Sequence, residues 1–542
     1  MKLRALSLIA AAAVAAGALA ACSSPAPSGS APAKAATTAK AATAAKAATT
    51  AAAPAASNGR QDTFILAQGA DPRGLDPAYV DDGESANVMV NVYEGLVQYG
   101  EKDTSLQPCL AESWTISDDG LVYVFKLKQG VKFHDGEDFN ADAVKKSIDR
   151  QLPPNDRSEM PYADFTFGYI DKVEVVDPYT VKITLKQPST PFLANLAMSL
   201  AAPIVAPKAI DDKTAMESPV GTGPYKFVSW EKGASVKLVA NDSYWGGAPK
   251  IKNLIFQIIP DNAARASAMM AGDIDGMAQV DPASVQALKD KGIPIYEAPG
   301  MNINYMAFDV TRPPFDNPKL REAVIRAINV PELVQQLYLG YSIPAYSILP
   351  SFIPGYAKDV KNYDYDPEKA KSLLQEAGAT NLNIKMIAYS NPRPYNTATG
   401  VKLAEAIQGY LSKVGVTCDI TQYDWTTYKK MAQQGEGDIK FYGWTGDNGD
   451  ADNFMNLLSV EDRSMNVSGY KNPAYTDLIN KAAATPNGDA RNALYAEMEK
   501  IIATDAPWLP ISHSIVLVPY ASGVVNFSQH PTGSTFFKYV SK

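Results

Sequence analysis

The sequence predicts an α/β protein of two lobes joined by a hinge. With 542 residues the chain is too long to fold around one hydrophobic core. Residues 62–254 are dominated by short β-branched and aromatic runs, whereas residues 316–443 alternate helical and strand patterns. Because residues 511–542 return to a strand pattern, we expect the chain to cross between lobes near Gly300 and Pro510. The predicted lobes are 61–300 for lobe I and 301–510 for lobe II, with 511–542 returning to lobe I.

Lobe I is expected to contain mainly strands. One helix should follow Asn140, and a second should span residues 189–200 with Pro191 in its first turn. Strands are expected at 63–67, 121–128, 173–176, 179–185, 225–230 and 235–240.

Lobe II begins with three helices that carry proline near the start: one after Asp316 or Asn317, one at Pro331 that Gly340 ends, and one from Asp366–Pro367 to Gly378. The pattern then alternates between strands at 382–389, 416–423 and 438–443 and helices at 397–414 and 425–434. This β-α-β-α-β order predicts a largely parallel sheet.

Ligands of such sheets bind outside the carboxyl ends of the strands. Residues 391–395 and 444–452 follow two of these strands, so they should meet there. The prediction brings Arg393 and Asp447 to one opening, although more than 50 residues separate them along the chain.

The loop after the last of these strands is crowded with carboxylates, since Asp447, Asp450 and Asp452 lie within FYGWTGDNGDADNF at 441–454. Like charges this close need fixed donors or a cation, which makes at least one of them a candidate ligand group. A solvated turn rich in Asp, Asn and Gly is the alternative.

The N-terminus predicts export and a lipid anchor. Lys2 and Arg4 precede an apolar run that ends in Leu19-Ala20-Ala21-Cys22, which indicates a signal peptide over 1–21 and a lipid-modified Cys22. A plain secretory signal with an incidental cysteine is the alternative. Residues 22–60 carry almost only small residues, proline and lysine, so we expect a flexible linker. Nothing after residue 60 has the pattern of a transmembrane helix.

Charge and motifs exclude several function classes. The first 61 residues hold six of the 50 basic residues and no acidic residue. The rest of the chain therefore has 44 basic against 58 acidic residues, and this net negative charge does not suit binding to nucleic acid. Gly221-Thr222-Gly223-Pro224 lacks the lysine of a phosphate loop, and Phe454 and Met455 stand where a calcium loop needs a ligand and a glycine. The three histidines are far apart, and no nucleophile has a base nearby. We therefore expect no enzyme, no cofactor and no metal site.

Only Cys109 and Cys418 remain in the body of the chain. A disulfide is possible in an exported protein, but two distant cysteines define no framework. Cys418 alternates with Val416 and Ile420 in a strand pattern, which favours a buried free thiol.

Several long motifs resemble one family. They are GADPRGLDP at 69–77, LAESWTISDDGLVYVFKLKQGVKFHDG at 110–136, GTGPYKF at 221–227, PPFDNPKLREAVIRAIN at 313–329, YDPEKAKSLLQEAG at 365–378, NPRPYN at 391–396 and GWTGDNGDADNF at 443–454. They resemble the extracytoplasmic solute-binding proteins of peptide-type ABC importers, above all the dipeptide-binding proteins. The resemblance implies a periplasmic-binding-protein-like fold with two subdomains in lobe I, no catalysis, and delivery of the ligand to a permease served by ATPase subunits.

The resemblance also implies site residues. Arg393 would take the carboxylate of a peptide and Asp447 its ammonium group, with Tyr395, Trp444 and Gly446 as pocket walls and Gly83 giving backbone contacts. A zwitterion suits a planar bidentate donor at one end and a carboxylate at the other. Haem, an amino-acid-like solute or a longer peptide remain alternative ligands, and a surface peptidase or a structural protein remain alternative classes.

Overall fold

The structure, a computed structural model, describes residues 60–461 and 463–542. The signal peptide, Cys22 and nearly all of the predicted linker therefore lie outside the described residues. Two large hydrophobic cores organise the described part, one built mainly by residues 64–256 and the other by residues 301–511. We call the parts around these cores lobe I and lobe II.

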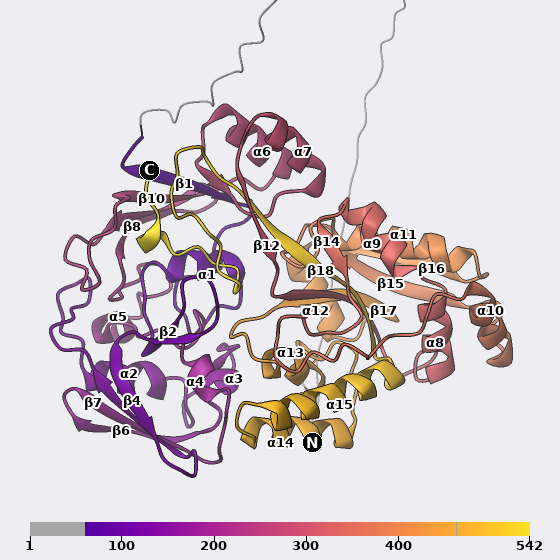
Figure 1. Ribbon diagram of the computed structural model, residues 1–542, viewed down its shortest axis with the longest axis horizontal. Helices are drawn as coiled ribbons and strands as arrows, with labels where there is room; N and C mark the ends of the chain where they lie inside the picture. Colours follow the sequence, from indigo (N-terminus) through magenta and orange to yellow (C-terminus); the bar gives the residue numbers. More distant parts are fainter. Residues whose placement is uncertain (1–59, 462) are drawn as a thin grey trace, which may run out of the picture. The chain divides into compact units, whose positions relative to one another are not determined.

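A five-stranded sheet in the order β11-β1-β10-β9-β8 forms the first half of lobe I. β1 is parallel to β10 and β11, and the other pairs are antiparallel. Helices α6 and α7 pack on β1 through Met269, Val285 and Leu288 (Figure 1). The elements are β1 (Thr63–Gln68), β8 (Tyr225–Glu231), β9 (Ser235–Ala240), β10 (Asn253–Ile258), β11 (Gly276–Met277), α6 (Asn262–Ala271) and α7 (Pro282–Asp290).

A four-stranded antiparallel sheet in the order β4-β5-β7-β6 forms the second half of lobe I. Helix α2 begins after Asn140, whose side chain accepts a hydrogen bond from the Ala143 amide, as its sequence predicted. The elements of this half are α1 (Gly83–Met89), β2 (Val97–Tyr99), β3 (Leu106–Pro108), β4 (Ala111–Ile116), β5 (Val122–Leu127), α2 (Ala141–Asp149), α3 (Ala163–Phe167), β6 (Ile170–Asp177), β7 (Thr180–Leu185), α4 (Phe192–Asn195) and α5 (Pro207–Asp211).

The helix expected over residues 189–200 is wrong. Only α4 (Phe192–Asn195) is helical, and the backbone reaches a positive φ of 62° at Ala201. Leu196, Met198 and Leu200 stay buried in irregular structure, so core packing overrides the helical pattern of this segment.

Lobe II is built on a seven-stranded sheet in the order β12-β18-β13-β17-β15-β16, with β14 paired to β18. β15 is parallel to β16 and β17, as the alternating pattern predicted, but β13 is antiparallel to β17 and β18, so the sheet is mixed. The strands are β12 (Ile295–Pro299), β13 (Asn302–Phe308), β14 (Ser342–Pro344), β15 (Asn383–Tyr389), β16 (Thr417–Tyr423), β17 (Ile439–Thr445) and β18 (Trp508–Pro519).

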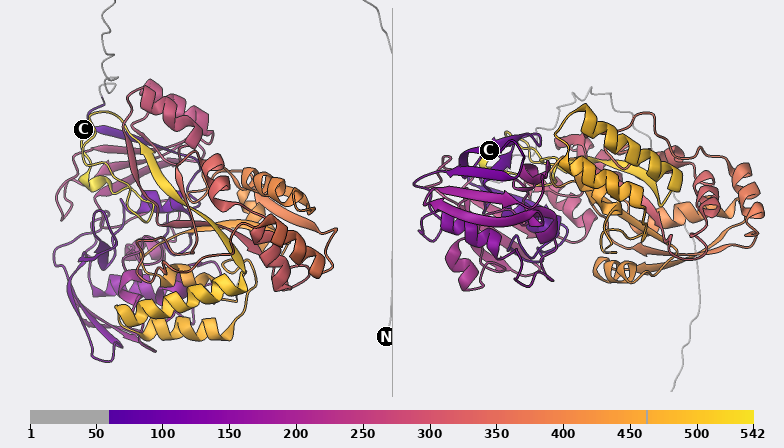
Figure 2. Two further views of the ribbon diagram at one scale, coloured as in Figure 1. Left: turned by 45° about the vertical axis from the view of Figure 1, so that its right-hand side comes forward. Right: turned by 90° about the horizontal axis from the view of Figure 1, so that it is seen from below.

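The helices of lobe II start where proline and a capping side chain predicted them. Asn317 caps α8 and Asp366 caps α10, each with proline at the first helical position. Near the chain end, α14 and α15 lie side by side (Figure 2). The helices are α8 (Pro318–Arg326), α9 (Val330–Tyr338), α10 (Pro367–Glu376), α11 (Gly400–Ser412), α12 (Trp425–Gln433), α13 (Asp452–Met455), η1 (Asn456–Leu458), α14 (Pro473–Ala484) and α15 (Asp489–Asp505). A short 3-10 helix after β18, η2 (Phe537–Tyr539), packs on lobe I through Phe537.

The terminal strand differs from its prediction. β18 does not join a sheet of lobe I; it pairs with β13 and β14 along its first part and with β12 along its last part. The end of β18 packs on lobe I through Leu517 and Val518, and the residues after it add Phe527, Phe537 and Val540 to the core of lobe I. β12 and β18 thus form a two-stranded connection between the lobes, because both chain crossings are hydrogen-bonded to each other. Within the described residues, no helix is long and apolar enough to cross a membrane.

Candidate functional site

The site begins at the carboxyl end of β17. At Gly443 a Cβ atom would collide with the ring of Tyr395 and lie 2.5 Å from the Ile303 carbonyl oxygen. A residue without a side chain is required here, since it lets the loop after β15 press against the strand. The strand itself is held from within by Lys440, which is fully buried and whose Nζ lies 2.9 Å from the Asp309 carboxylate.

Asp447 follows β17 and faces neutral donors. Its carboxylate accepts hydrogen bonds of 3.2 Å from the Tyr162 hydroxyl and 3.2 Å from the Asn453 amide, and its carbonyl oxygen accepts one of 3.1 Å from the Tyr99 hydroxyl. Burial raises the pKa of Asp447 to about 7, although the bonds from Asn453 and Tyr162 act in the opposite direction. Within the described chain no cation pairs with this carboxylate, so a cationic group would find an uncompensated partner here.

Asn453 organises this end of the site. Its Oδ1 atom accepts hydrogen bonds from the Trp444 indole, at 2.7 Å, and from the Asp447 amide, at 3.1 Å. Trp444 is half-buried and packs against the cores of both lobes. Asn453 therefore couples the orientation of Asp447 to an aromatic side chain that contacts both lobes.

Arg393 lies in the loop after β15, which is fixed by Asn396. The backbones of Arg393 and Asn396 exchange two hydrogen bonds of 2.9 Å. The buried Asn396 side chain accepts a bond from Tyr338 and donates one to Tyr389, each 2.9 Å long. The Asn396 side chain thus anchors the loop in lobe II. Its backbone pairing with Arg393 fixes the position of Arg393 next to this anchor.

The guanidinium group of Arg393 has a cation–π contact but no carboxylate partner. Its Cζ lies 4.5 Å from the ring centre of Trp425, its Nε is buried without a hydrogen-bond acceptor, and no ion pair reaches it from the described residues. Burial lowers the pKa of Arg393, but the negative charges around it, Glu84 first among them, outweigh burial and raise the pKa. An anion would therefore meet a charged, partly unsatisfied donor.

Arg393 and Asp447 share a surrounding set of residues. The Tyr162 hydroxyl donates a hydrogen bond to Asp447. Burial is the main cause that raises the pKa of this hydroxyl, and the charges of Asp447 and Asp81 raise it further. Burial raises the pKa of the Tyr442 hydroxyl on β17; Asp81 raises this pKa further, and Arg393 lowers it. Tyr162, Tyr442 and Asp81 therefore lie in the surroundings of the two predicted ligand groups, and the binding of one ligand by both groups stays a prediction.

The remaining predicted residues have mixed surroundings. Tyr395 is 6% exposed with no hydrogen-bond partner for its hydroxyl, which suits a pocket wall. Gly446 is buried, and a Cβ there would lie 2.8 Å from the Phe454 ring, so it serves close packing of the loop. Gly83 is exposed at the start of α1 with open space around it, between Asp82 and Glu84. The roles of these residues and of Trp444 as ligand contacts stay predictions.

The other two aspartates of the loop have structural partners. Asp450 forms a two-bond ion pair with Arg491, at 2.6 and 2.9 Å. Asp452 is buried at the start of α13, and burial raises its pKa to about 7. Of the three crowded carboxylates, Asp447 alone combines partial exposure with neutral partners.

Several hydrogen bonds cross between the lobes on the Asp447 side. The Asn448 side chain donates to Asn195 at 2.6 Å, and Thr190 donates through its amide to Ala483 O and through its hydroxyl to Thr485 O, at 2.7 and 2.9 Å. Lys429 on α12 lies 3.4 Å from Asp81. The lobes are therefore in direct contact around the site.

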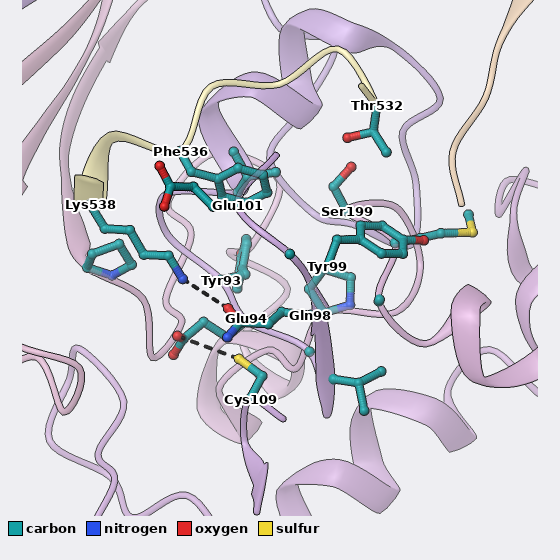
Figure 3. A pocket seen from close by; sticks show the side chains of 18 of the residues that line it. Tyr93, Glu94, Gln98, Tyr99, Glu101, Cys109, Ser199, Thr532, Phe536 and Lys538 are labelled. Atoms are coloured by element: carbon teal, nitrogen blue, oxygen red, sulfur yellow. Dashed lines mark hydrogen bonds between the residues drawn. The ribbon is translucent and has the colours of Figure 1, made fainter. Parts of the chain in front are cut away.

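A separate cavity lies within lobe I (Figure 3). It has a volume of about 60 Å³, and Glu94, Cys109 and Lys538 are among its lining residues. Glu94 accepts hydrogen bonds from Tyr244, Trp245 and Thr222, at 2.6, 2.8 and 2.8 Å, so its carboxylate is already satisfied. Cys109 is buried and Cys418 half-buried, and both thiols are free. The cavity does not include Arg393 or Asp447.

Residues 105–466 match the family model of bacterial extracellular solute-binding proteins, family 5 Middle. The chain belongs to this family. It is 35% identical to heme-binding protein A of Haemophilus influenzae, covering 90% of this chain and 93% of that protein. It is 34% identical to the dipeptide-binding protein of Escherichia coli, covering 88% and 94%. The solved dipeptide-binding protein of Pseudoalteromonas sp. SM9913 in complex with Met-Leu superposes with a TM-score of 0.83 at 28% identity, covering 89% of this chain and all of that one.

Family membership confirms the predicted fold class, a two-lobed α/β solute-binding protein, and the resemblance to receptors of peptide-type ABC importers. The chain is an extracytoplasmic solute-binding protein. Sequence reasoning missed Tyr162, Tyr99, Asn453 and Trp425. Asn453 lay within the quoted motif, but the hydroxyl groups of Tyr99 and Tyr162 come from lobe I, and nothing in their local sequence signals that they reach Asp447.

Proposed function

We propose that this protein is a lipid-anchored receptor that captures dipeptides outside the cytoplasm and delivers them to the permease of an ABC importer. The observation that carries the proposal is the pair of opposite charges without ion-pair partners in the described chain: Asp447 among neutral donors and Arg393 over Trp425. A short zwitterionic peptide supplies the missing ammonium at one end and the missing carboxylate at the other. The receptor binds its ligand without changing it.

Two relatives support different ligands, because one is named for haem and another for dipeptides. The propionates of haem could pair with Arg393, but haem carries no ammonium group and would leave Asp447 buried without a cation. A charge buried without a partner is costly, so the site favours the peptide. An amino-acid-like solute or a longer peptide would place one of its charged ends away from Arg393 or Asp447.

The test is calorimetry on protein freed of bound ligand by unfolding and refolding. Ala-Ala should bind, whereas N-acetyl-Ala-Ala, Ala-Ala-amide, tri-alanine and tetra-alanine should bind more weakly. Removing one member of a buried charge pair costs about 2–5 kcal/mol, so Asp447→Asn and Arg393→Gln should each weaken Ala-Ala binding by roughly one and a half to three and a half decades.

Asp119→Asn is the matched control, because Asp119 is exposed in the turn between β4 and β5. It should leave Ala-Ala binding as in the wild type. Equal affinity across the peptide series, or haem binding that exceeds dipeptide binding, would contradict the proposal. Release of free alanine during incubation would instead indicate a peptidase.

A further inference from the structure

Three side chains of lobe I contact the start of the loop after β17, which belongs to lobe II. The hydroxyl groups of Tyr99 and Tyr162 bond to Asp447, and Asn195 accepts a bond of 2.6 Å from the side chain of Asn448. Tyr99 bonds to the backbone carbonyl oxygen of Asp447, whereas Tyr162 bonds to its carboxylate. Of these three contacts between the lobes, only the one from Tyr162 therefore reaches a group whose charge can change.

The two carboxylate oxygens of Asp447 have different surroundings. Oδ2 accepts both side-chain bonds, from Tyr162 and from Asn453, each 3.2 Å long, and no described residue donates to Oδ1. The orientation of the Asn453 amide is fixed, because its oxygen accepts from the Trp444 indole and the Asp447 backbone amide, two groups that can only donate. The NH2 group of Asn453 must therefore face the carboxylate. The Oδ1 atom of Asp447 is left for a proton in the neutral form or for the ammonium group of a ligand.

Ionisation of Asp447 changes the strength of the Tyr162 bond. Burial raises the pKa of Asp447 to about 7, although the bonds from Asn453 and Tyr162 lower it, so below neutral pH the ligand-free carboxyl group keeps its proton. An ammonium group that takes Oδ1 displaces this proton into the solvent, and no covalent bond of the ligand changes. The bond from Tyr162 to Oδ2 then ends on a carboxylate, and such charge-assisted bonds are roughly twice as strong as neutral ones.

The other charged groups near these hydroxyls already have partners. Burial and Asp447 raise the pKa of both hydroxyl groups, and Asp81 raises it further at Tyr162 and Asp450 at Tyr99. Both additional carboxylates form salt bridges: Asp81 with Arg73 and Lys429, and Asp450 with Arg491. An arriving ammonium group is therefore the event that changes the charge at the acceptor of the Tyr162 bond.

We infer that Tyr162 is a positioning residue that increases the specificity of the site for a free ammonium group, to which it responds through Asp447. Capture of the ammonium strengthens the bond from Tyr162, and because this bond crosses between the lobes, it holds lobe I on the occupied site. A ligand without an ammonium group leaves the bond in its weaker, neutral form. This inference rests on the proposed function, because it takes the ammonium group of a dipeptide to lie at Asp447.

Two tyrosine variants and one pair of ligands test the inference. Tyr162→Phe removes the bond to the carboxylate, and Tyr99→Phe, the matched control, removes the bond to the backbone carbonyl oxygen. Ala-Ala and N-propanoyl-alanine differ only by the ammonium group, and calorimetry in which N-propanoyl-alanine displaces Ala-Ala at pH 6 measures both affinities. The ratio of the two affinities should fall by about fivefold in Tyr162→Phe. In Tyr99→Phe both affinities should fall by the same factor, which leaves the ratio as in the wild type.

The pH profile of Ala-Ala binding is a second measurement, which requires no weak ligand. The bond from Tyr162 favours the ionised carboxylate, so its loss should raise the pKa of Asp447, and affinity should begin to fall at a higher pH in Tyr162→Phe than in the wild type. Tyr99 does not contact the carboxylate, so Tyr99→Phe should keep the wild-type profile. Unchanged melting temperatures would verify that both variants fold.

The outcomes separate this inference from the proposed function. Equal affinity ratios and equal pH profiles in Tyr162→Phe and Tyr99→Phe overturn the role of Tyr162 while leaving the dipeptide receptor intact. Failure of the wild type to bind Ala-Ala overturns the proposed function and the inference with it.

Discussion

The hydrogen-bond donors to the Asp447 carboxylate are neutral groups, which distinguishes this residue from an aspartate paired with lysine or arginine at the surface. Tyr162 and Asn453 stabilise its charge, but neither carries a positive charge of its own, so burial dominates and the pKa rises to about 7. Near neutral pH the carboxyl group is therefore poised between its two forms. An arriving ammonium group would favour the ionised form, which makes ligand binding and proton release one event.

Dipeptide affinity should accordingly fall as the pH falls. Below about 7 the ligand-free Asp447 is protonated and must lose its proton to bind ammonium, so affinity should weaken by up to about tenfold per pH unit. Titration calorimetry between pH 5 and 7.5 measures this slope. Asp447→Asn should flatten it, although a weaker slope can remain from Asp82, whose pKa is raised to about 6. An equal slope in wild type and variant would show that another group titrates.

Through Asp447, the stability of the fold depends on pH in the opposite direction from dipeptide affinity. The folded protein keeps the Asp447 proton from the ordinary pKa of 3.8 up to about 7, whereas the unfolded chain loses it near 3.8. The contribution of this carboxyl group to stability is therefore fully present below 3.8 and declines as the pH rises toward 7.

Sequence reasoning reached Arg393 and Asp447 for a physical reason. Both follow strands of a parallel set, and the carboxyl ends of such strands lie together wherever the loops lead. Tyr162, Tyr99 and Glu84 could not be reached that way, because they belong to lobe I and approach the site only through tertiary packing. The sequence could therefore suggest the proposed pair for a zwitterion, whereas it could not suggest the neighbours of this pair from the other lobe.

At the scale of elements, the loop after β15 and the strand β17 act as one unit. Tyr395 packs on Gly443, and the Ser514 hydroxyl on β18 donates a 2.7 Å bond to the Tyr395 carbonyl oxygen. Arg393 is two residues from Tyr395, so the position of the guanidinium depends on this packing.

Gly443→Ala should therefore damage both stability and binding. The added methyl group would collide with the Tyr395 ring, and overpacking of this kind costs about 1–3 kcal/mol. Urea denaturation should show the loss, and calorimetry should show weaker dipeptide binding as Arg393 moves. Gly409→Ala is the matched control: it lies in α11 with open space around it and should stabilise the protein by about 0.5–1 kcal/mol. Unchanged binding by Gly443→Ala would show that the loop is positioned independently of the strand.

The elements that the sequence predicted well carry their own local signals. α8, α10 and α2 start at capping side chains, two of them followed by proline, and such signals act over a few residues. The failures depended on distant contacts. Residues 196–200 are buried without being helical, and β18 pairs with three strands that lie far from it in sequence. The mixed sheet was missed because β13 and β18 flank the alternating segment and join it only in the fold.

At the scale of the whole molecule, the proposed receptor would have to stay near its permease, and the sequence predicts that Cys22 holds it at the membrane. Wild-type protein expressed with its proposed signal peptide should fractionate with membranes, because the proposed lipid on Cys22 would anchor it. Cys22→Ser should release the protein or leave it unprocessed, as membrane fractionation and the mass of the mature chain would show. Cys418→Ser is the control and should fractionate like wild type. Normal processing and membrane association of Cys22→Ser would mean that the cysteine is not the anchor.

Closure of the lobes is the last property of the whole chain that the structure makes testable. β12 and β18 connect the lobes, and the bonds from Thr190 to Ala483 and Thr485 hold them together beside Asp447. Saturating dipeptide should reduce the radius of gyration in solution scattering, as expected of hinge closure around a ligand.

Thr190→Val keeps the shape of the side chain and removes only the hydroxyl bond to Thr485, which contributes about 0.5–1.5 kcal/mol to the closed arrangement. Because only the closed protein surrounds the ligand, a smaller closed population should weaken apparent affinity by up to about tenfold, chiefly through faster dissociation. The saturated variant should still reach the wild-type radius of gyration. Thr532→Val, at a residue with no bond between the lobes, should change neither quantity. Identical scattering with and without dipeptide in the wild type would mean that the lobes do not move on binding, and that Thr190 supports a rigid site.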